Sequence, residues 1–212
     1  MGVSDMARPM TIHLHRGDLP AGLALGKAIA VDTETMGLDP ARDRLCLVQL
    51  SAGDGNSHLV QFAAGQYDAP RLKALLADPQ VLKIFHFARF DLAMIDRYLG
   101  VRATPVYCTK VASKLARTFT DRHGLKDLCR EILGVELSKQ QQSSDWGAAE
   151  LSDEQKRYAS ADVEHLHALK ARLDTMLARE GRAAIAKACF DFLPTRAALD
   201  LAGFPGPDLF EH

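Results

Sequence analysis

The sequence predicts an α/β protein: a mixed β-sheet flanked by helices, in a single domain with a helical C-terminal part. Short apolar runs bounded by turn residues fill the first half, and such runs are typical of strands. In the second half, apolar residues recur at helical spacing. The 212 residues, 47% hydrophobic and 25% charged, are enough to build one full core.

The first half supplies most of the expected strands. Clusters of Gly, Asp, Asn and Pro at 37–43 and 52–56 separate the apolar runs as turns. A helix is expected at 69–79, and the apolar run 81–87 suits a buried strand. The earlier strands are expected at 11–15, 28–34, 44–50 and 57–62.

The second half is mainly helical. A helix over 88–100 ends at Gly100, which suits a C-cap, and 104–109 is expected to be the last strand. Strands first, with helices mixed in later, predict a mixed sheet covered by helices. The remaining helices are expected at 110–118, at 124–134, and over a long region from 151–177 into 183–193.

Composition limits the classes of protein to consider. No apolar run approaches the roughly 18 residues of a membrane span, and the N-terminus shows no secretory signal. We expect 1–9 to be a disordered leader or a tag remnant and 10–212 to form the domain. Four scattered cysteines without a CxxC pair favour reduced thiols in a cytoplasmic protein over a zinc site.

The charge is close to balanced overall but uneven along the chain. A formal net charge of −1 argues against a protein that coats long nucleic acids. Residues 81–130 nevertheless contain ten Lys or Arg against four Asp, a local excess of +6. These side chains either form a solvated basic face or accompany the phosphates of a short substrate.

Four acidic residues stand at the edges of apolar segments. Asp32 and Glu34 end a strand and share one face about 6.6 Å apart, because side chains alternate along a strand. Asp91 and Asp162 lie beside apolar helical stripes, and Tyr158 is one turn before Asp162. Each acid alone has a structural explanation, such as a favourable helix dipole or a Tyr–Asp hydrogen bond. Together they would be severely destabilising without a counter-charge, which Mg²⁺ or Mn²⁺ supplies.

Three short motifs carry a family resemblance. "VDTET" (31–35), "HFARFD" (86–91) and "YASADV" (158–163) resemble the three motifs of the 3′–5′ exonuclease family with four acidic residues. Tyr158 marks the tyrosine subclass (DEDDy), to which RNase D belongs; the histidine subclass has His where Arg157 stands. The compact length is similar to that of small RNase D-like members. Phe87 departs from relatives that often have Asn at this position.

The resemblance implies an RNase H-like fold and two-metal hydrolysis of phosphodiesters with Mg²⁺ or Mn²⁺. It implies that a tyrosine orients the attacking water, that 5′-mononucleotides leave from the 3′ end, and that the protein forms a homo-oligomeric ring, an octamer. Five residues are expected to be catalytic: Asp32, Glu34, Asp91 and Asp162 as metal ligands, and Tyr158.

Four residues are candidate substrate contacts. By position in the resemblance, Leu38 wedges between the last two bases, or else it only caps the sheet edge, and the Thr33 backbone NH binds the terminal ribose. His86 contacts a ribose or a phosphate, or is structural. Lys139, in the polar loop 138–146, grips a 5′ phosphate, or the loop is merely surface; substitution of Lys139 should then weaken 5′-phosphorylated dinucleotides most. His165 and His167 are expected at the surface.

The sequence therefore predicts a cytoplasmic, metal-dependent 3′–5′ exoribonuclease that degrades short single-stranded RNA, dinucleotides included, with no membrane partner. One alternative is a 3′–5′ DNA exonuclease acting on single or double strands, because nothing in the motifs reads the 2′-hydroxyl. Another is RNase D-like processing of RNA 3′ ends. A third is a catalytically silent nucleic-acid-binding module that reuses the fold.

Overall fold

A six-stranded mixed sheet forms the centre of the computed structural model, which describes residues 10–138, 144–206 and 209. The expectations for the leader 1–9 and for Lys139 lie outside these residues. β3 runs antiparallel to both neighbours, whereas β1–β4, β2–β5 and β5–β6 pair in parallel. The strand order is β1 (Thr11–Arg16), β4 (Asn56–Gln61), β3 (Leu45–Ser51), β2 (Ala28–Thr35), β5 (Leu82–Phe85), β6 (Val106–Cys108).

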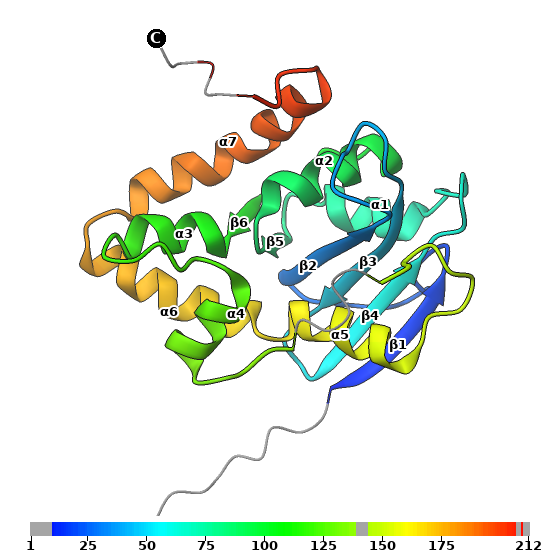
Figure 1. The fold of residues 1–212 in the computed structure, drawn as a ribbon, viewed down its shortest axis with the longest axis horizontal. Coiled ribbons are helices and arrows are strands. Elements are labelled where there is room, and N and C mark those ends of the chain that lie inside the picture. The colour runs from blue at the N-terminus through cyan, green and yellow to red at the C-terminus, as the bar shows by residue number, and fades with distance from the viewer. Residues whose placement is uncertain (1–9, 139–143, 207–208, 210–212) are drawn as a thin grey trace, which may run out of the picture.

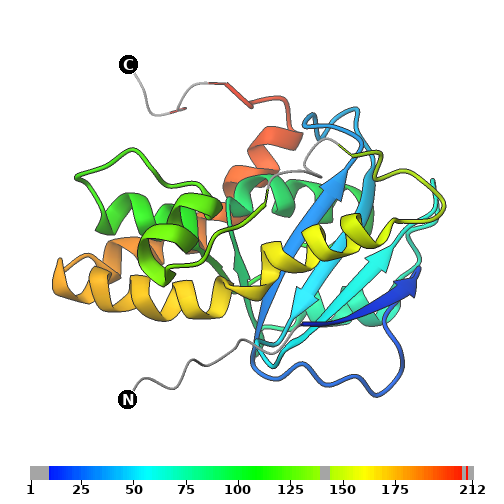
Figure 2. The ribbon, with the colours of Figure 1, turned by 60° about the horizontal axis from the view of Figure 1, so that its bottom comes forward.

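Helices flank this sheet, which confirms the predicted fold class. α5 packs across β1 to β4, α7 packs against α2, and α3 packs against α6 (Figure 1). Figure 2 shows α5 lying along the sheet before the chain continues into α6. The helices are α1 (Pro70–Ala77), α2 (Ala88–Leu99), α3 (Thr109–Ala116), α4 (Leu125–Leu128) with a π-helical turn (Cys129–Leu133), α5 (Asp153–Glu164), α6 (Leu166–Arg179) and α7 (Ala183–Leu201).

The helical C-terminal part differs from the prediction in two places. The long region from 151 breaks at His165, so that α5 can lie on the sheet while α6 packs beside α3. α7 continues through Pro194, where the sequence predicted an end at Leu193. Proline removes one helical hydrogen bond, but the buried face of Phe190, Leu193 and Ala197 continues across it. Tertiary packing therefore outweighs the local break.

His167 does not lie free at the surface as expected. Its ring is half-buried, and Nε2 contacts the carbonyl oxygen of Ser51 at 3.1 Å. Through this contact it ties α6 to the end of β3. His165 is half-buried at the break between the two helices.

Local contacts fix the position of α5, which carries two of the motif residues. Ser152 and Gln155 form a reciprocal capping box at its start. Gln155 also donates to the carbonyl of Asp145, and the hydroxyls of Ser160 and Ser57 lie 2.6 Å apart. The middle of α5 is thereby tied to β4, and its first turn to the segment around Asp145.

The structure bears on two expectations from composition, which concern membrane spans and the state of the cysteines. Within the described residues, no helix combines the length and apolar character that a membrane span needs. All four cysteines are unpaired: Cys46, Cys108, Cys129 and Cys189. Their predicted reduced state is consistent with this arrangement, while the cytoplasmic location stays a prediction.

A buried lysine holds the β5–β6 side of the sheet together. Lys83 is fully buried, and its Nζ donates to the carbonyls of Asp78, Val81 and Thr104 at 2.6–2.8 Å. Lys83→Met is expected to lower the free energy of unfolding by about 3 kcal/mol, because it removes a buried donor from these three carbonyls, of which that of Asp78 still accepts from the Val81 N–H. Urea denaturation checks this, with exposed Lys114→Met as the control. Equal midpoints for the two variants would contradict it.

Candidate active site

Parallel strands bring several polar side chains to one edge of the sheet. β2, β5 and β6 run parallel, so their carboxyl ends meet at the same edge, where ligands bind in open α/β sheets. Asp32 and Glu34 lie at the end of β2. His86 and Phe87 follow β5, and Lys110 follows β6. All five line one cavity of about 360 Å³.

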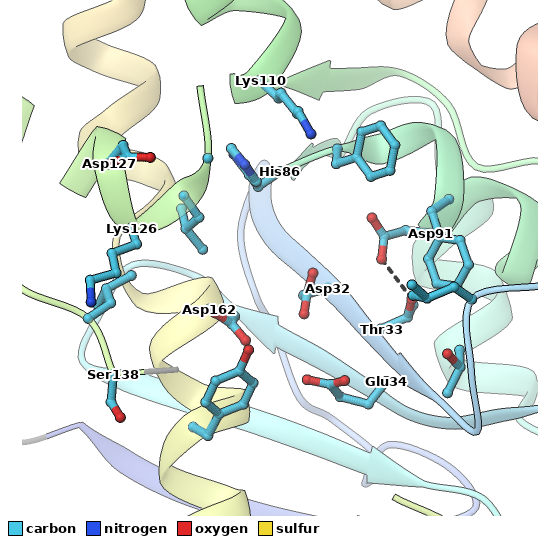
Figure 3. A pocket seen from close by; sticks show the side chains of 18 residues that line it. Asp32, Thr33, Glu34, His86, Asp91, Lys110, Lys126, Asp127, Ser138 and Asp162 are labelled. Carbon is cyan, nitrogen blue, oxygen red and sulfur yellow. Dashed lines mark hydrogen bonds between the residues drawn. The ribbon is translucent and has the colours of Figure 1, made fainter. Parts of the chain in front are cut away.

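Three carboxylates converge in this cavity. Asp32 and Glu34 from β2 and Asp162 from α5 each offer an oxygen atom, and these atoms all lie within 4.8 Å of one another (Figure 3). The strand alternation predicted that Asp32 and Glu34 share a face, and the structure places them so. A register shift between Glu34 and Thr35 then ends the regular pairing with β3.

Asp91 approaches the same cavity from α2. Its side chain is only 3% exposed, and Oδ1 accepts a hydrogen bond of 2.7 Å from the Thr33 hydroxyl. Thr33 lies between the two acids of β2, so this bond links the first motif to the second. The structure therefore brings all four predicted acids to one cavity, with Asp91 outside the tight group of three.

The four acids strongly perturb one another's titration. Burial raises the pKa of Asp32 from its ordinary 3.8 to about 7. Burial, followed by the charge of neighbouring carboxylates, also raises the pKa values of Glu34, Asp91 and Asp162 well above their ordinary range. Such a group costs folding energy unless protons or cations neutralise it. Closely spaced carboxylate oxygens are the ligands that Mg²⁺ and Mn²⁺ prefer, so this donor set fits those ions.

Tyr158 lies beside the acids on the same helix. It is half-buried, and its ring centroid is 6.0 Å from that of Trp146, which is buried in a small apolar cluster. Burial, and then the charges of Asp162, Glu34 and Asp32, raise the pKa of Tyr158 above its ordinary 10. The phenol therefore stays protonated at neutral pH.

Three of the four candidate substrate contacts can be placed in the structure. Thr33, Leu38 and His86 all line the cavity. Leu38 is 85% exposed, so it does not pack as a cap on the sheet edge, and the wedge role stays a prediction. Lys139 lies outside the described residues, although its neighbour Ser138 lines the cavity.

Sequence reasoning missed other residues of the cavity wall. The excess of basic residues at 81–130 indicated which segment could accompany phosphates. It did not indicate that Lys110 and Lys126 are the lysines of that segment that line the cavity. Lys110 Nζ lies 4.1 Å from the Phe87 ring centroid, a cation–π geometry. The available signal for Lys110 was its place directly after a strand parallel to the one that carries Asp32.

Comparisons with known proteins agree with this geometry. A family model described as "3'-5' exonuclease" matches residues 18–178. Ribonuclease D of Gluconacetobacter diazotrophicus is 38% identical over 154 residues, and that of Granulibacter bethesdensis is 35% identical over 156. These matches cover 73% and 74% of this chain. The chain thus spans about 39% of the length of these curated relatives.

Solved structures give the more complete match. Brucella melitensis NrnC (nano-RNase C) bound to pGG is 55% identical with a TM-score of 0.93, covering 96% of this chain and 99% of that one. The same protein with bound Mg²⁺ is 54% identical with a TM-score of 0.92, covering 96% and 100%. Escherichia coli RNase D is 27% identical with a TM-score of 0.70, covering 81% of this chain but 45% of its own. The chain belongs to the 3′–5′ exonuclease family, as a compact RNase D-like member similar to NrnC.

Proposed function

We propose that the protein is a metal-dependent 3′–5′ exoribonuclease that hydrolyses short oligoribonucleotides, dinucleotides included, to 5′-mononucleotides. The observation that carries this is the convergence of Asp32, Glu34 and Asp162 within 4.8 Å, in a cavity that also contains Asp91 and Tyr158. The family match and the similarity to an NrnC bound to pGG support the reaction type and the short substrate.

The residues divide into two sets of ligands for two divalent cations, Mg²⁺ or Mn²⁺. Asp32, Glu34 and Asp162 would hold the first ion, and Asp32 and Asp91 the second. When bound, such ions lower the pKa of a water molecule and offset the charge that develops on the phosphate and the departing 3′-oxygen. Thr33 fixes Asp91 through its hydroxyl, and its backbone NH, which faces the carboxylates of Asp32 and Asp91, would bind the terminal ribose in this proposal.

In this proposal Tyr158 acts on the attacking water. Because its pKa lies above 10, the Tyr158 hydroxyl orients the attacking water by hydrogen bonding and is not a standing base. Tyr158→Phe is therefore expected to lower kcat about 100-fold and to leave Mg²⁺ binding intact. Single-turnover hydrolysis and calorimetric Mg²⁺ titration measure the two effects. The control is Tyr98→Phe, which removes only a bond to the Asp43 carbonyl. Undiminished turnover would exclude the tyrosine from the reaction.

The cavity wall suggests how a short RNA is held. The exposed Leu38 would wedge between the last two bases, because stacking on an apolar side chain tolerates any base. Lys110 and Lys126 would offset phosphate charge. We also propose a homo-oligomeric ring, an octamer, and a cytoplasmic location; light scattering of the purified protein tests the ring.

An RNA length series tests the function. End-labelled di- to heptamers with Mg²⁺ should lose mononucleotides from the 3′ end, fastest for the shortest, and EDTA should stop the reaction. Matched DNA series, single- and double-stranded, and a structured RNA with a 3′ extension are run in parallel. Faster cleavage of DNA would favour the DNA exonuclease, and preferred trimming of the structured RNA would favour RNase D-like processing. Binding without cleavage would indicate a silent binding module.

A further inference from the structure

His86 is anchored by a short hydrogen-bond chain. Thr109 Oγ1 donates to the carbonyl oxygen of Phe85 at 3.2 Å, and His86 Nδ1 lies 2.9 Å from the same Thr109 oxygen. A threonine hydroxyl has one proton, so both bonds are made only if Nδ1 carries the imidazole proton and donates it. The network therefore assigns the Nδ1–H tautomer, which leaves a lone pair on Nε2.

The other edge of the ring is available to a ligand. His86 lines the cavity that contains Asp32 and Asp91 (Figure 3), and within the described chain no hydrogen-bond partner reaches Nε2. Burial, and then the charge of Lys110, lower the pKa of His86 to about 3. The ring thus stays neutral at working pH, and Nε2 is an acceptor only.

A neutral acceptor restricts what His86 can bind. Phosphodiester oxygens are themselves acceptors, so of the two contacts the sequence left open, ribose or phosphate, the geometry favours ribose. The acids mark the position of the scissile phosphate, and the donors nearest to it are hydroxyls of the two flanking sugars. In the proposed function the terminal ribose binds at the Thr33 backbone NH, where the carboxylates of Asp32 and Asp91 are at hand to accept the proton of its 3′-hydroxyl. The 2′-hydroxyl is the donor that remains.

We propose that His86 Nε2 accepts a hydrogen bond from a ribose 2′-hydroxyl beside the scissile phosphate, so that this site selects RNA over DNA. The proposal rests on the proposed function and names its sugar specificity. DNA lacks the donor and leaves the acceptor unpaired, and an unmade bond of this kind costs about 1.4 kcal/mol, or about tenfold in rate.

Metal binding is the competing role for a neutral imidazole. Among the described residues, the group whose ligand atoms converge is Asp32, Glu34 and Asp162, and His86 is not a member. The positive charge of Lys110 acts on the His86 ring and disfavours a cation there. Both observations favour a hydroxyl over an ion at Nε2.

Two substitutions distinguish the role of His86 Nδ1, which anchors the ring to Thr109, from that of Nε2, the acceptor. In His86→Asn, the amide Nδ2 takes the place of Nδ1 and can still donate to Thr109, but no atom remains at the position of Nε2. In His86→Gln, the amide oxygen reaches toward that position and restores an acceptor. His13→Asn, on the distant edge strand β1, is the matched control.

The experiment measures kcat/KM for a ribodinucleotide, for the same dinucleotide with one 2′-deoxy sugar at either position, and for the DNA dinucleotide. The wild type should favour RNA, with the loss on deoxy substitution concentrated at one sugar. His86→Asn should lower the RNA-to-DNA ratio of kcat/KM about tenfold, and His86→Gln should recover part of it. His13→Asn should keep the wild-type ratio. Imidazole ¹⁵N shifts should show a protonated Nδ1 and a bare Nε2.

Three results would overturn the inference: no RNA preference in the wild type, an equal loss on RNA and DNA in His86→Asn, or a protonated Nε2. A weaker Mg²⁺ affinity in His86→Asn, measured by calorimetry without substrate, would assign the ring to the metal instead. In all of these cases the nuclease activity itself stands. If the wild type releases no mononucleotide from any substrate, the proposed function fails, and the inference falls with it.

Discussion

Asp32→Asn is expected to lower kcat/KM on short RNA by about 10³-fold while making the metal-free protein more stable. Asp32 lies at the centre of the acidic group and is assigned to both ions. The amide keeps the size of the side chain but removes the negative charge that a hard cation requires. The loss of the electrostatic stabilisation that the ions supply accounts for the size of the effect.

The substitution lowers activity but raises stability because Asp32 is buried beside other carboxylates. Burial holds the pKa of Asp32 near 7, and the charge of Asp32 raises the pKa values of Glu34, Asp91 and Asp162. Above pH 7 Asp32 is ionised, and the substitution removes its repulsion of the other three acids. The free energy of unfolding in EDTA should therefore rise, by about 1 kcal/mol, as is common where an active site trades stability for function.

Steady-state hydrolysis and thermal unfolding in EDTA measure the two quantities. The matched control is Glu150→Gln, which neutralises an exposed acid paired with Arg16. It should change neither activity nor stability appreciably, because exposed ion pairs contribute little. An Asp32→Asn protein that is less stable than the wild type in EDTA would show that the acids do not repel one another in the free protein.

Much of this site follows from rules that act along the chain. Strand alternation predicts that Asp32 and Glu34 share a face, and helical spacing places Tyr158 and Asp162 one turn apart. These relations depend only on local geometry. The order of the motifs then indicates that Asp91 joins them, and the structure places it in the same cavity.

The remaining features depend on tertiary contacts. The bond from Thr33 to Asp91 joins residues 58 positions apart, and no local pattern specifies it. Lys110 enters the cavity because β6 lies parallel beside β5. The break at His165 was missed because both sides of it have good helical periodicity.

Phe87 shows a conflict between local preference and the site. It caps α2 with a φ of 68°, in the left-handed region, and makes no side-chain capping bond. Asn, common here in relatives, tolerates this conformation and caps helices well, so Phe is the poorer local choice on both counts. Its ring is 46% exposed, lines the cavity and lies under Lys110. Strain of this kind persists where the surroundings gain from it, as in this cavity wall.

Divalent cations are expected to stabilise the protein strongly at pH 8 and only weakly at pH 5. The acids have raised pKa values in the folded state, from 3.8 to about 7 for Asp32. Between about pH 4 and pH 7 the folded protein therefore holds protons that the unfolded chain has released. By linkage, the metal-free protein is most stable below this window and loses stability as the pH rises through it.

Mg²⁺ competes with those protons for the same oxygen atoms, so its stabilising effect grows as they leave. An ion present at about 1,000 times its Kd adds about 4 kcal/mol to the free energy of unfolding. Thermal unfolding at pH 5, 6.5 and 8, in EDTA and in Mg²⁺, measures this difference, with NaCl at equal ionic strength as the control for screening. If NaCl stabilises as well as Mg²⁺, the acids are only screened. If the EDTA form is most stable at pH 8, the carboxylates have counter-charges of their own and need no metal.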